Sequence, residues 1–484
     1  MPRTAVLRFD ASPTIGIGHA IRCIAIAEAL SRENWSVKFA TSANCAPTVK
    51  SLTQRWQVID LPSDMQGEIG ALAALGPCDL LLVDHYGRNA EFETSVRGMT
   101  RSLVALDDRS DTVHRADFVI NPIPGFSNDT ILSGPSYAPL RSMFLRRRRE
   151  SAARRRNAGQ NPKRALVGFG GFDSGGMAAR AIAGVAAFDR RIQIDVVVGN
   201  IEEQNSALTS GRDHGITVRA HIRPTDPAGL AAEADIAFGN AGMTNWERCC
   251  LGLPSVMVDV VDNQLPVAQA TEDAGAAIWL RRKQASETAH WLAAVKRLCE
   301  SPDTLIQTSA NALALCDGRG SARILTFIDR PLDRNGTPIS LRPALPSDEA
   351  ILLDWQREPG MRTHARQSGI PTEREHRAWF AAKRRNADCV FNIIVAGTKE
   401  VGFLRFDRIA DTDRAWEVSI GISSTARQRG IAQLALALGR RLMADADLHA
   451  RVLADNDASH QLFRRAGYKP VSYTHLTLPT IYSV

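Results

Sequence analysis

A short apolar strand, a glycine-bearing loop and an amphipathic helix follow one another twice in this chain. The first instance starts at Thr4, with TAVLRF, a loop that contains Gly16 and Gly18, and a helical run. The second starts at Arg164, with LVGFGG ahead of a helix over residues 177–188. Apolar residues at three- and four-residue spacing predict the helices, and short β-branched runs predict the strands. Because alternating strands and helices are typical of parallel sheets with crossover connections, we predict two α/β halves in tandem.

Two polar segments separate the predicted domains. Residues 146–163 carry seven arginines between Arg146 and Arg156, and they predict a solvated surface helix or linker. Residues 329–338, DRPLDRNGTP, contain two prolines and a glycine and predict a second linker. The predicted domains are therefore residues 1–145, 164–328 and 339–470.

The third domain has a different order of elements. From residue 339 the chain predicts a strand, two helices, three strands, a helix, a strand and a last helix, which is an α+β arrangement rather than a third copy of the first two halves. Residues 471–484, VSYTHLTLPTIYSV, lack the alternation of a final strand and look like translated sequencing adapter. We therefore expect a non-native tail and a sheet without its last strand.

Composition and cysteine spacing narrow the classes of protein. The chain is 44% apolar and 23% charged, as globular proteins are, and a net charge of +7 is small for 484 residues. Its eight cysteines include no C-x-x-C and no regular spacing, which argues against a disulfide framework or a zinc module. The chain shows neither a signal peptide nor a run of about 18 apolar residues. We predict a cytoplasmic protein without a membrane, nucleic-acid or metal partner.

The first glycine loop ends in a histidine. Gly16, Gly18 and His19 stand at the predicted strand-to-helix turn. Glycine permits close backbone approach there, and the free N–H groups of a helix start attract an anion. An imidazole in the first helical turn can position or deprotonate water. The same residues would also suit a plain turn with a surface histidine.

The second half carries a comparable loop, GNAGMTNWE, again between a predicted strand and a predicted helix. We expect the backbone N–H groups of Gly242, Met243 and Thr244 to hold a diphosphate, and Glu247 to accept hydrogen bonds from ribose hydroxyls. Residues 262–264, DNQ, follow the strand-like PSVMVDV at the carboxyl end of the sheet, where ligands of open α/β sheets bind. We expect these loops to converge on one crevice.

In combination these motifs resemble the nucleotide-sugar hydrolases of pseudaminic acid biosynthesis. Between about Arg3 and Phe327 the chain contains, in order, R-x-D-A-S, G-I-G-H, L-V-D-H-Y, L-D-D, F-G-G-x-D, G-N-A-G-M-T-N-W-E, L-G-L-P and D-N-Q. Those enzymes act on UDP-2,4-diacetamido-2,4,6-trideoxy-β-L-altropyranose. They have two Rossmann-like domains in a GT-B-like arrangement, and the resemblance implies the same fold here.

The resemblance also implies roles for individual residues. It makes His19 the residue that activates water and places Tyr86, as a second catalytic residue, on the sugar side with Asp84. It implies that residues 242–247 hold the UDP. Further substrate contacts are implied for the following residues: Gly16, Gly18, Gly170, Gly171, Asn263 and Gln264. The two α/β halves contain no D-x-D motif, so we expect catalysis without a metal.

A third motif lies in the α+β domain. Residues 427–432, RQRGIA, stand between a predicted strand and a long helix, where N–H groups and arginine suit the pyrophosphate of coenzyme A. The loop resembles the R/Q-x-x-G-x-G/A loop of GNAT acetyltransferases, and the N-x-x-S at Asn456 matches a later part of that family's pattern. The resemblance implies acetyl-CoA as co-substrate. The implied binding residues are Val418, Ile420, Ile422, Arg427, Gln428, Arg429, Gly430, Ile431, Ala432 and Asn456.

The acid and base of this acetyltransferase are harder to assign. Many GNAT enzymes place a tyrosine near the asparagine helix, but this chain has Phe463 there, so Tyr468 or a water molecule would have to serve. Glu417 is a candidate base, although the pattern favours an ordinary edge-strand glutamate.

These observations favour a bifunctional enzyme of nucleotide-sugar metabolism. Its first two domains would hydrolyse the UDP-sugar, and its third would acetylate the 4-amino precursor of that sugar. Two alternatives remain open at this point. One is a GT-B glycosyltransferase with an attached acetyltransferase, and the other is a non-catalytic protein that binds a nucleotide sugar.

Overall fold

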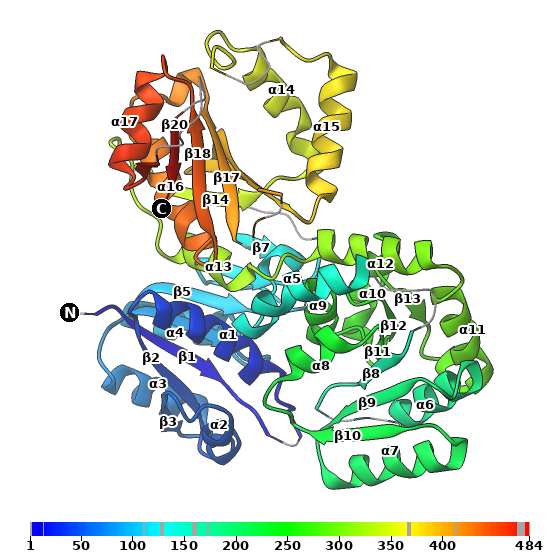
Figure 1. The fold of residues 1–484 in the computed structure, drawn as a ribbon. Coiled ribbons are helices and arrows are strands. Elements are labelled where there is room, and N and C mark those ends of the chain that lie inside the picture. Colours follow the sequence, from blue (N-terminus) through cyan, green and yellow to red (C-terminus); the bar gives the residue numbers. More distant parts are fainter. Residues whose placement is uncertain are drawn as a thin grey trace. The chain divides into compact units, whose positions relative to one another are not determined.

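A computed structural model describes residues 2–12, 14–109, 112–125, 130–156, 162–171, 173, 175–364, 369–410, 412, 414–471 and 480–483. The chain divides into two compact units, residues 1–321 and residues 322–484. The first unit contains two halves, each with its own parallel sheet, and the second unit contains a third sheet (Figure 1). The boundary falls seven residues before the predicted one at 328, so most of the helix that ends the predicted second domain belongs to the second unit.

The sheet of the first half has seven parallel strands in the order β3-β2-β1-β4-β5-β6-β7. Its strands are β1 (Thr4–Phe9), β2 (Ser36–Ser42), β3 (Gln57–Leu61), β4 (Cys78–Asp84), β5 (Thr100–Leu106), β6 (Phe118–Asn121) and β7 (Ile131–Ser133). Its helices are α1 (Gly18–Arg32), α2 (Ala46–Leu52), α3 (Met65–Ala74) and α4 (Ala90–Val96). The central strands β1 and β4 are buried almost throughout, because helices cover both faces of a parallel sheet.

The second half has six parallel strands in the order β10-β9-β8-β11-β12-β13. Its strands are β8 (Arg164–Gly168), β9 (Gln193–Val198), β10 (Val218–Ile222), β11 (Ile236–Asn240), β12 (Ser255–Val258) and β13 (Ile278–Leu280). Its helices are α6 (Met177–Phe188), α7 (Ile201–His214), α8 (Pro227–Glu233), α9 (Met243–Cys250), α10 (Leu265–Asp273), α11 (Thr288–Leu298) and α12 (Pro302–Leu315).

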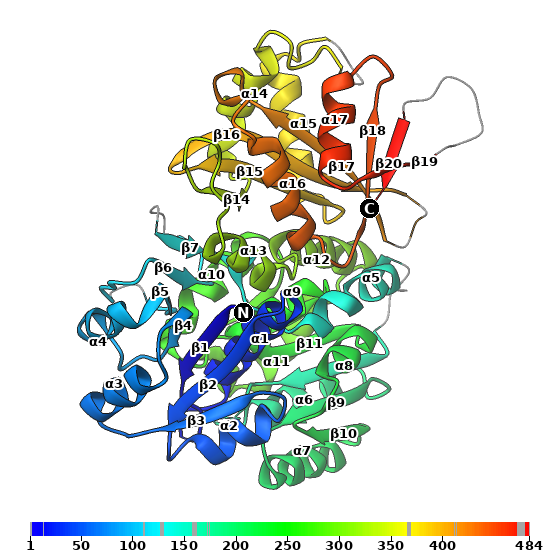
Figure 2. The ribbon, with the colours of Figure 1, turned by 90° about the vertical axis from the view of Figure 1, so that its left-hand side faces the viewer.

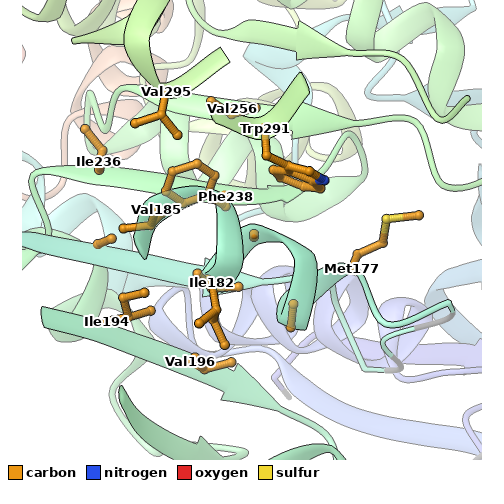
Figure 3. Close-up of a cluster of buried hydrophobic side chains, with 14 of the residues drawn as sticks. Met177, Ile182, Val185, Ile194, Val196, Ile236, Phe238, Val256, Trp291 and Val295 are labelled. Carbon is orange, nitrogen blue, oxygen red and sulfur yellow. The ribbon is translucent and has the colours of Figure 1, made fainter. Parts of the chain in front are cut away.

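The core of the second half packs α6 and α11 against the sheet (Figure 3). Ile182 and Val185 of α6 are buried with Phe238 of β11 and Trp291 of α11. A Cβ atom added at Gly184 would collide with Trp291, so the close approach of α6 and α11 requires glycine there.

The arginine-rich segment forms a helix, α5 (Ser142–Arg156), which is one of the two forms predicted for it. Four of its arginines are exposed, but Arg148 is half-buried and Arg155 is buried. Arg148 donates to the carbonyls of Cys250, Leu313 and Cys316 at 2.7–2.8 Å. Buried Arg155 donates to two carbonyls at the end of α8, both at 2.9 Å. Helix C-termini leave carbonyls without partners, and these guanidinium groups supply the missing donors. The charge run therefore fastens α5 to the ends of α8, α9 and α12.

The second unit is an α+β domain whose seven-stranded sheet has the order β14-β15-β16-β17-β18-β20-β19 (Figure 2). Its strands are β14 (Ile339–Pro343), β15 (Cys389–Ala396), β16 (Lys399–Arg408), β17 (Ala415–Ile422), β18 (Asp447–Val452), β19 (Lys469–Val471) and β20 (Thr480–Ser483). Its helices are α13 (Gly320–Ile328), α14 (Glu349–Arg357), α15 (Glu373–Arg385), α16 (Ile431–Leu442) and α17 (Asp457–Arg465). Side chains of α16 and α17 share one buried cluster with β14–β18, and those of α14 and α15 share another with β15.

Two predictions about this unit are wrong. The chain after residue 470 was expected to leave the sheet one strand short, but β20 pairs with both β18 and β19 (Figure 2). The predicted linker 329–338 is an ordered turn, because Leu332 and Pro338 form a β-bridge and Asp333 accepts from the N–H groups of Asn335 and Thr337 at 2.9 Å. No helix in the described part of the chain is long and apolar enough to cross a membrane.

Candidate functional site

In each half of the first unit, the strands that follow the first strand of that half lie on both sides of it. We call this place, where the order of the strands reverses, the reversal point. β1 lies between β2 and β4, and β8 lies between β9 and β11. Loops that leave two such strands run in opposite directions, which opens a crevice at the carboxyl end of the sheet. In the first half these loops carry Gly16–His19 and His85–Gly87, and in the second half they carry Gly170–Gly171 and Ala241–Gly242. The glycine loops predicted in the first two domains thus lie where the order of strands reverses.

His19, in the first turn of α1, is held by the last residue of β4. Its Nδ1 lies 2.5 Å from Asp84 Oδ1, and only 8% of His19 is exposed. Arg22, one helical turn later, donates to both oxygens of the same carboxylate, at 2.6 and 3.0 Å. Burial alone would raise the pKa of Asp84, but Arg22 and His19 hold it below its usual value. Asp84 is therefore ionised beneath the histidine.

This arrangement determines the tautomer of His19. Nδ1 also lies 2.8 Å from Arg22 Nη2, but its contact with Asp84 Oδ1 is the shorter one. Because an ionised carboxylate can only accept, we assign the proton to Nδ1, which donates it to Asp84. Nε2 then has a free lone pair, and among the described residues it has no hydrogen-bond partner. A neutral imidazole with this tautomer can accept a proton from water.

The neighbouring histidine has the opposite arrangement. Gly87 N–H donates to His85 Nδ1 at 2.9 Å, so the proton of His85 is on Nε2, which lies 3.2 Å from Asp10 Oδ2. Both ring nitrogens of His85 are therefore engaged. Although the two histidines lie at the same reversal point, only His19 keeps an acceptor for a reacting proton.

Tyr86 packs against His19. The two ring centroids are 4.8 Å apart in an edge-on arrangement, and the hydroxyl donates to Asp108 Oδ1 at 2.7 Å. Burial, the Asp108 carboxylate and other neighbours raise the pKa of Tyr86, so the phenol stays protonated. Arg22 also reaches Asp108, at 3.3 Å. One guanidinium therefore joins the carboxylate that orients His19 to the carboxylate that orients Tyr86.

The structure corrects one assigned contact and adds two residues. Asp84 was expected to line the sugar side, but it is fully buried and both of its oxygens are occupied, so it acts on His19 instead. Sequence reasoning missed Arg22 and Asp108. Their only signals were the spacing of Arg22, three residues after His19, and the L-D-D motif that ends in Asp108.

The loops of the two halves meet at this site. A Cβ atom added at Gly171 would lie 3.5 Å from Cγ1 of Ile17, in the loop just ahead of His19. One added at Gly170, whose φ of +94° favours glycine, would lie 3.5 Å from Nδ2 of Asn240. The glycine loop after β8 thus contacts both the His19 loop and the end of β11.

At the start of α9 the groups available to a ligand are backbone N–H groups, because the neighbouring polar side chains are hydrogen-bonded within the fold. Gly242 is the N-cap of α9 without a capping side chain. The N–H of Asn245 donates to the carbonyl of Gly242 at 2.9 Å, whereas those of Met243 and Thr244 have no partner among the described residues and could bind an anion. The hydroxyl of Thr244 donates to Asn240 at 2.8 Å, and the buried amide of Asn245 donates to Thr271 at 2.8 Å. Both side chains are used within the fold, which leaves the backbone groups of residues 242–244 for a ligand.

Glu247 and the DNQ segment flank this helix start. Glu247 pairs with Arg141 at 3.4 Å, and burial raises its pKa while Arg141 opposes the shift. Gln264 accepts from the N–H of Val260 at 2.9 Å, and its amide nitrogen lies 3.5 Å from where a Cβ of Gly242 would be. Asn263 is exposed. No group of histidine, cysteine and carboxylate side chains in the described residues could hold a metal ion.

In the second unit, the loop of residues 427–430 leads into α16. Gln428 and Gly430 both have left-handed backbone conformations, with φ of +65° and +81°, and Gly430 is the N-cap of α16. That backbone exposes the first-turn N–H groups of Ile431 and Ala432 beside the loop. Arg427 is exposed and donates to the carbonyl of Ile422 at 3.2 Å.

The strand ahead of this loop separates from its neighbour. β17 pairs with β18 only over Ala415–Glu417, although β17 continues to Ile422. Val418, Ile420 and Ile422 lie in the diverging part, and their side chains face the buried cluster of α16. The backbone edge of β17 beyond Glu417 therefore has no partner strand on the β18 side among the described residues.

Three further candidates in this unit are Asn456, Tyr468 and Glu417, and the buried hydroxyl of Tyr468 has no hydrogen-bond partner among the described residues. Asn456 caps α17, because its side-chain oxygen accepts from the N–H of Ser459 at 3.1 Å. Tyr468 is 3% exposed in the core beside Phe463, and burial raises its pKa to about 12. Arg451 lies 3.8 Å from Glu417. A buried tyrosine of this kind is poorly suited to donate a proton to a leaving thiolate, so Tyr468 is a weak candidate for the acid.

Comparison with known proteins agrees with this architecture. The first unit has the GT-B-like arrangement of two Rossmann-like domains. The solved structure of MurG from Acinetobacter baumannii superposes on this chain with a TM-score of 0.52 at 13% identity. The match covers 68% of this chain and 99% of the MurG chain, and it establishes a shared fold. The second unit carries an acetyltransferase (GNAT) domain, because residues 339–469 match that family. The predicted fold class and acetyltransferase domain are thus confirmed.

One protein is similar in sequence to the larger part of this chain. The spore coat polysaccharide biosynthesis protein SpsG of Bacillus subtilis (strain 168) is 25% identical to this chain over 336 residues. The match covers 65% of this chain and 94% of SpsG. The chain is therefore similar to SpsG through its GT-B-like part and carries an additional GNAT domain.

Proposed function

We propose that this chain is a bifunctional enzyme of nucleotide-sugar metabolism. Its first unit hydrolyses UDP-2,4-diacetamido-2,4,6-trideoxy-β-L-altropyranose to UDP and the free sugar. Its second unit transfers an acetyl group from acetyl-CoA to the 4-amino group of the UDP-sugar precursor. The observation that carries the hydrolase assignment is the free Nε2 of His19, oriented by Asp84, at the same reversal point as the glycine loops.

The hydrolysis follows from that geometry. His19 Nε2 accepts a proton from water as the water oxygen attacks the anomeric carbon, and the bond from that carbon to the diphosphate oxygen breaks. The imidazolium that forms is stabilised by Asp84, which Arg22 keeps ionised and in place. Tyr86 holds the edge of the imidazole and presents its ring to the sugar.

The leaving group is assigned to the second half. The first-turn N–H groups of α9 at Met243 and Thr244, with Gly242 and the glycines after β8, are positioned to bind the diphosphate as negative charge grows on it. Glu247 accepts from the ribose hydroxyls, and Asn263 and Gln264 contact the sugar or its phosphate. Likeness to a polysaccharide biosynthesis protein supports a sugar nucleotide as the substrate.

The acetyl transfer uses the second unit alone. Acetyl-CoA lies along the open edge of β17, with its diphosphate on the loop of residues 427–430. The amine of the sugar attacks the thioester carbonyl, the C–S bond breaks, and the amine proton passes to solvent as the CoA thiolate is protonated. Glu417, whose carboxylate lies 3.8 Å from Arg451, is the candidate base that would pass that proton on to solvent.

One experiment separates this proposal from its alternatives. The full-length protein is incubated with the UDP-diacetamido sugar, without any acceptor, and UDP and free sugar are both quantified. Equal release of UDP and free sugar supports a hydrolase. A requirement for an acceptor would indicate a glycosyltransferase, and UDP binding without turnover would indicate a binding protein. Incubation with acetyl-CoA and the 4-amino precursor tests the second activity.

The independence of the two activities has its own test. Gly430→Val places a β-branched residue at a φ of +81°, which costs roughly 1–2 kcal/mol and crowds the loop. Acetylation is expected to stop, whereas hydrolysis of pre-acetylated sugar continues. Gly397→Val, at a φ of +63° in the turn between β15 and β16, is the matched control for backbone strain. Loss of both activities in folded Gly430→Val protein would show that the units depend on each other.

A further inference from the structure

The turn of residues 333–336 lies ahead of the GNAT match, which starts at residue 339, yet it contacts the loop of residues 427–430. The N–H of Arg334 donates to the carbonyl of Arg429 at 3.1 Å. Its guanidinium Nη1 donates to the carbonyl of Gln428 at 3.0 Å. A Cβ added at Gly430 would lie 3.9 Å from both Cγ and Nε of Arg334. The arginine therefore lies across the start of α16.

The same turn also pairs with Arg429, an arginine of the loop of residues 427–430, so this arginine is less available to bind a ligand. Arg429 Nη2 lies 2.5 Å from Asp333 Oδ2 and 3.2 Å from the hydroxyl of Thr337. Burial opposes ionisation of Asp333, but hydrogen bonds from the backbone of Thr337 and Asn335, together with Arg429, hold its pKa below the usual value. The charge of Arg429 is thus balanced by a carboxylate from the turn.

The exposed cation beside the start of α16 is therefore Arg334, not Arg429. A guanidinium has five N–H donors, and among the described residues the side chain of Arg334 makes one hydrogen bond, through Nη1. Its side chain is exposed, and it faces the N-cap residue Gly430 instead of a carboxylate. Arginine binds phosphate oxygens in pairs through this fork, and a helix start adds N–H groups aimed at the same anion.

We propose that Arg334 binds the diphosphate of coenzyme A, so that a residue outside the family's own pattern completes the coenzyme site. This inference rests on the proposed acetyltransferase activity. Three groups then surround the diphosphate, which are the guanidinium of Arg334, the guanidinium of Arg427 and the N–H groups at the start of α16. The diphosphate is preferred over the 3′-phosphate because Arg334 lies over Gly430, where the helix N–H groups converge.

The test is calorimetric binding of CoA and of dephospho-CoA, which lacks the 3′-phosphate, to the full-length protein. Arg334→Ala is expected to weaken both ligands by the same factor, about tenfold, as loss of a charge-assisted hydrogen bond would. Arg334→Lys, which keeps the charge, should lose about threefold. Asn335→Ala, in the same turn but with no side-chain contact among the described residues, is the matched control and should bind like the wild type.

A purely structural role gives a different result. Arg334→Gln can still donate to the carbonyl of Gln428 but has no charge, so wild-type affinity in this variant would mean that the residue only braces the loop. Weakening of CoA with no change for dephospho-CoA would move the contact to the 3′-phosphate. Either result overturns the proposal, as does unchanged affinity in Arg334→Ala. Failure of the wild-type protein to bind CoA would instead overturn the proposed acetyltransferase.

Discussion

The two proposed sites of this chain are built in opposite ways. In the first unit, His19, Asp84 and Arg22 are 8%, 0% and 3% exposed, and they form a closed ionic network. In the second, Arg334 and Arg427 are exposed, and the binding groups are backbone N–H groups at a helix start. Proton transfer requires a fixed tautomer, which burial and a paired charge provide. Anion binding requires only donors of the right sign, which can remain at the surface.

The largest expected effect is on proton transfer. His19→Ala should lower UDP release by about 10²- to 10⁴-fold, because it removes the general base, while equilibrium UDP affinity stays nearly unchanged. Steady-state UDP release and calorimetry measure the two quantities. His85→Gln is the comparison variant, since both nitrogens of His85 are engaged elsewhere. Near wild-type release in His19→Ala would remove this histidine from the mechanism.

The buried ionic network around Asp84 should also contribute to the free energy of unfolding, whereas the exposed coenzyme site around Arg334 should not. Arg22→Met leaves the Asp84 carboxylate buried without a cation, with hydrogen bonds from His19 and Cys23 only among the described residues, and breaking a buried pair costs about 3–5 kcal/mol. Arg334→Ala should change stability by less than about 0.5 kcal/mol, because surface substitutions usually do. Denaturant unfolding of the full chain, with the transition of each unit followed separately, measures both. Equal losses would contradict the contrast between the sites.

A pH effect is expected in the first unit as well. His114 lies 2.6 Å from Glu93 and 3.3 Å from Asp107, and although burial opposes it, hydrogen bonds and ion pairs with Asp107 and Glu93 raise its pKa to about 9. Its stabilising contribution is complete below its unfolded value of 6.5 and disappears as pH rises to about 9. Between these two pH values the free energy of unfolding is expected to fall by on the order of 3 kcal/mol. His114→Gln should make stability of this unit flatter over that range, and an unchanged profile would contradict the assignment.

The smallest effect concerns UDP binding. Glu247→Ala should weaken UDP by about 1–3 kcal/mol, because charge-assisted bonds to the ribose are lost. Glu247→Gln, which keeps the shape and one acceptor, should lose less. Calorimetry with UDP decides the matter. If both variants bind like the wild type, the Arg141–Glu247 pair is only structural.

The sequence predicted loops well and ionic partners poorly. Gly16, Gly170, Gly242 and Gly430 were found because glycine between a strand and a helix is a local signal. That Gly16, Gly170 and Gly242 lie where strand order reverses depends on the order of the strands in the sheet, which no local pattern encodes. Arg22 and Asp108 were missed because they are distant in sequence, and only the fold brings them together.

The run of arginines in α5 also shows that a local pattern does not predict contacts with distant residues. The arginines of α5 were expected in solvent because most such runs are solvated. Arg148 and Arg155 instead satisfy carbonyls at the ends of other helices, and these acceptors have no side-chain signature in the sequence. The predicted linker 329–338 failed for a related reason, since its Asp-Arg-Asn-Gly turn is held by the distant residues Gln428 and Arg429.

That turn bears on how the acetyltransferase could be moved between genes. A gene segment cut at residue 339, where the family match begins, would encode the strands and helices but leave Asp333 and Arg334 behind. Arg429 would then lose its carboxylate, and the backbone of Gln428 would lose its donor. A portable version of this domain would therefore start near residue 322, at the boundary between the two compact units and ahead of the recognisable family sequence.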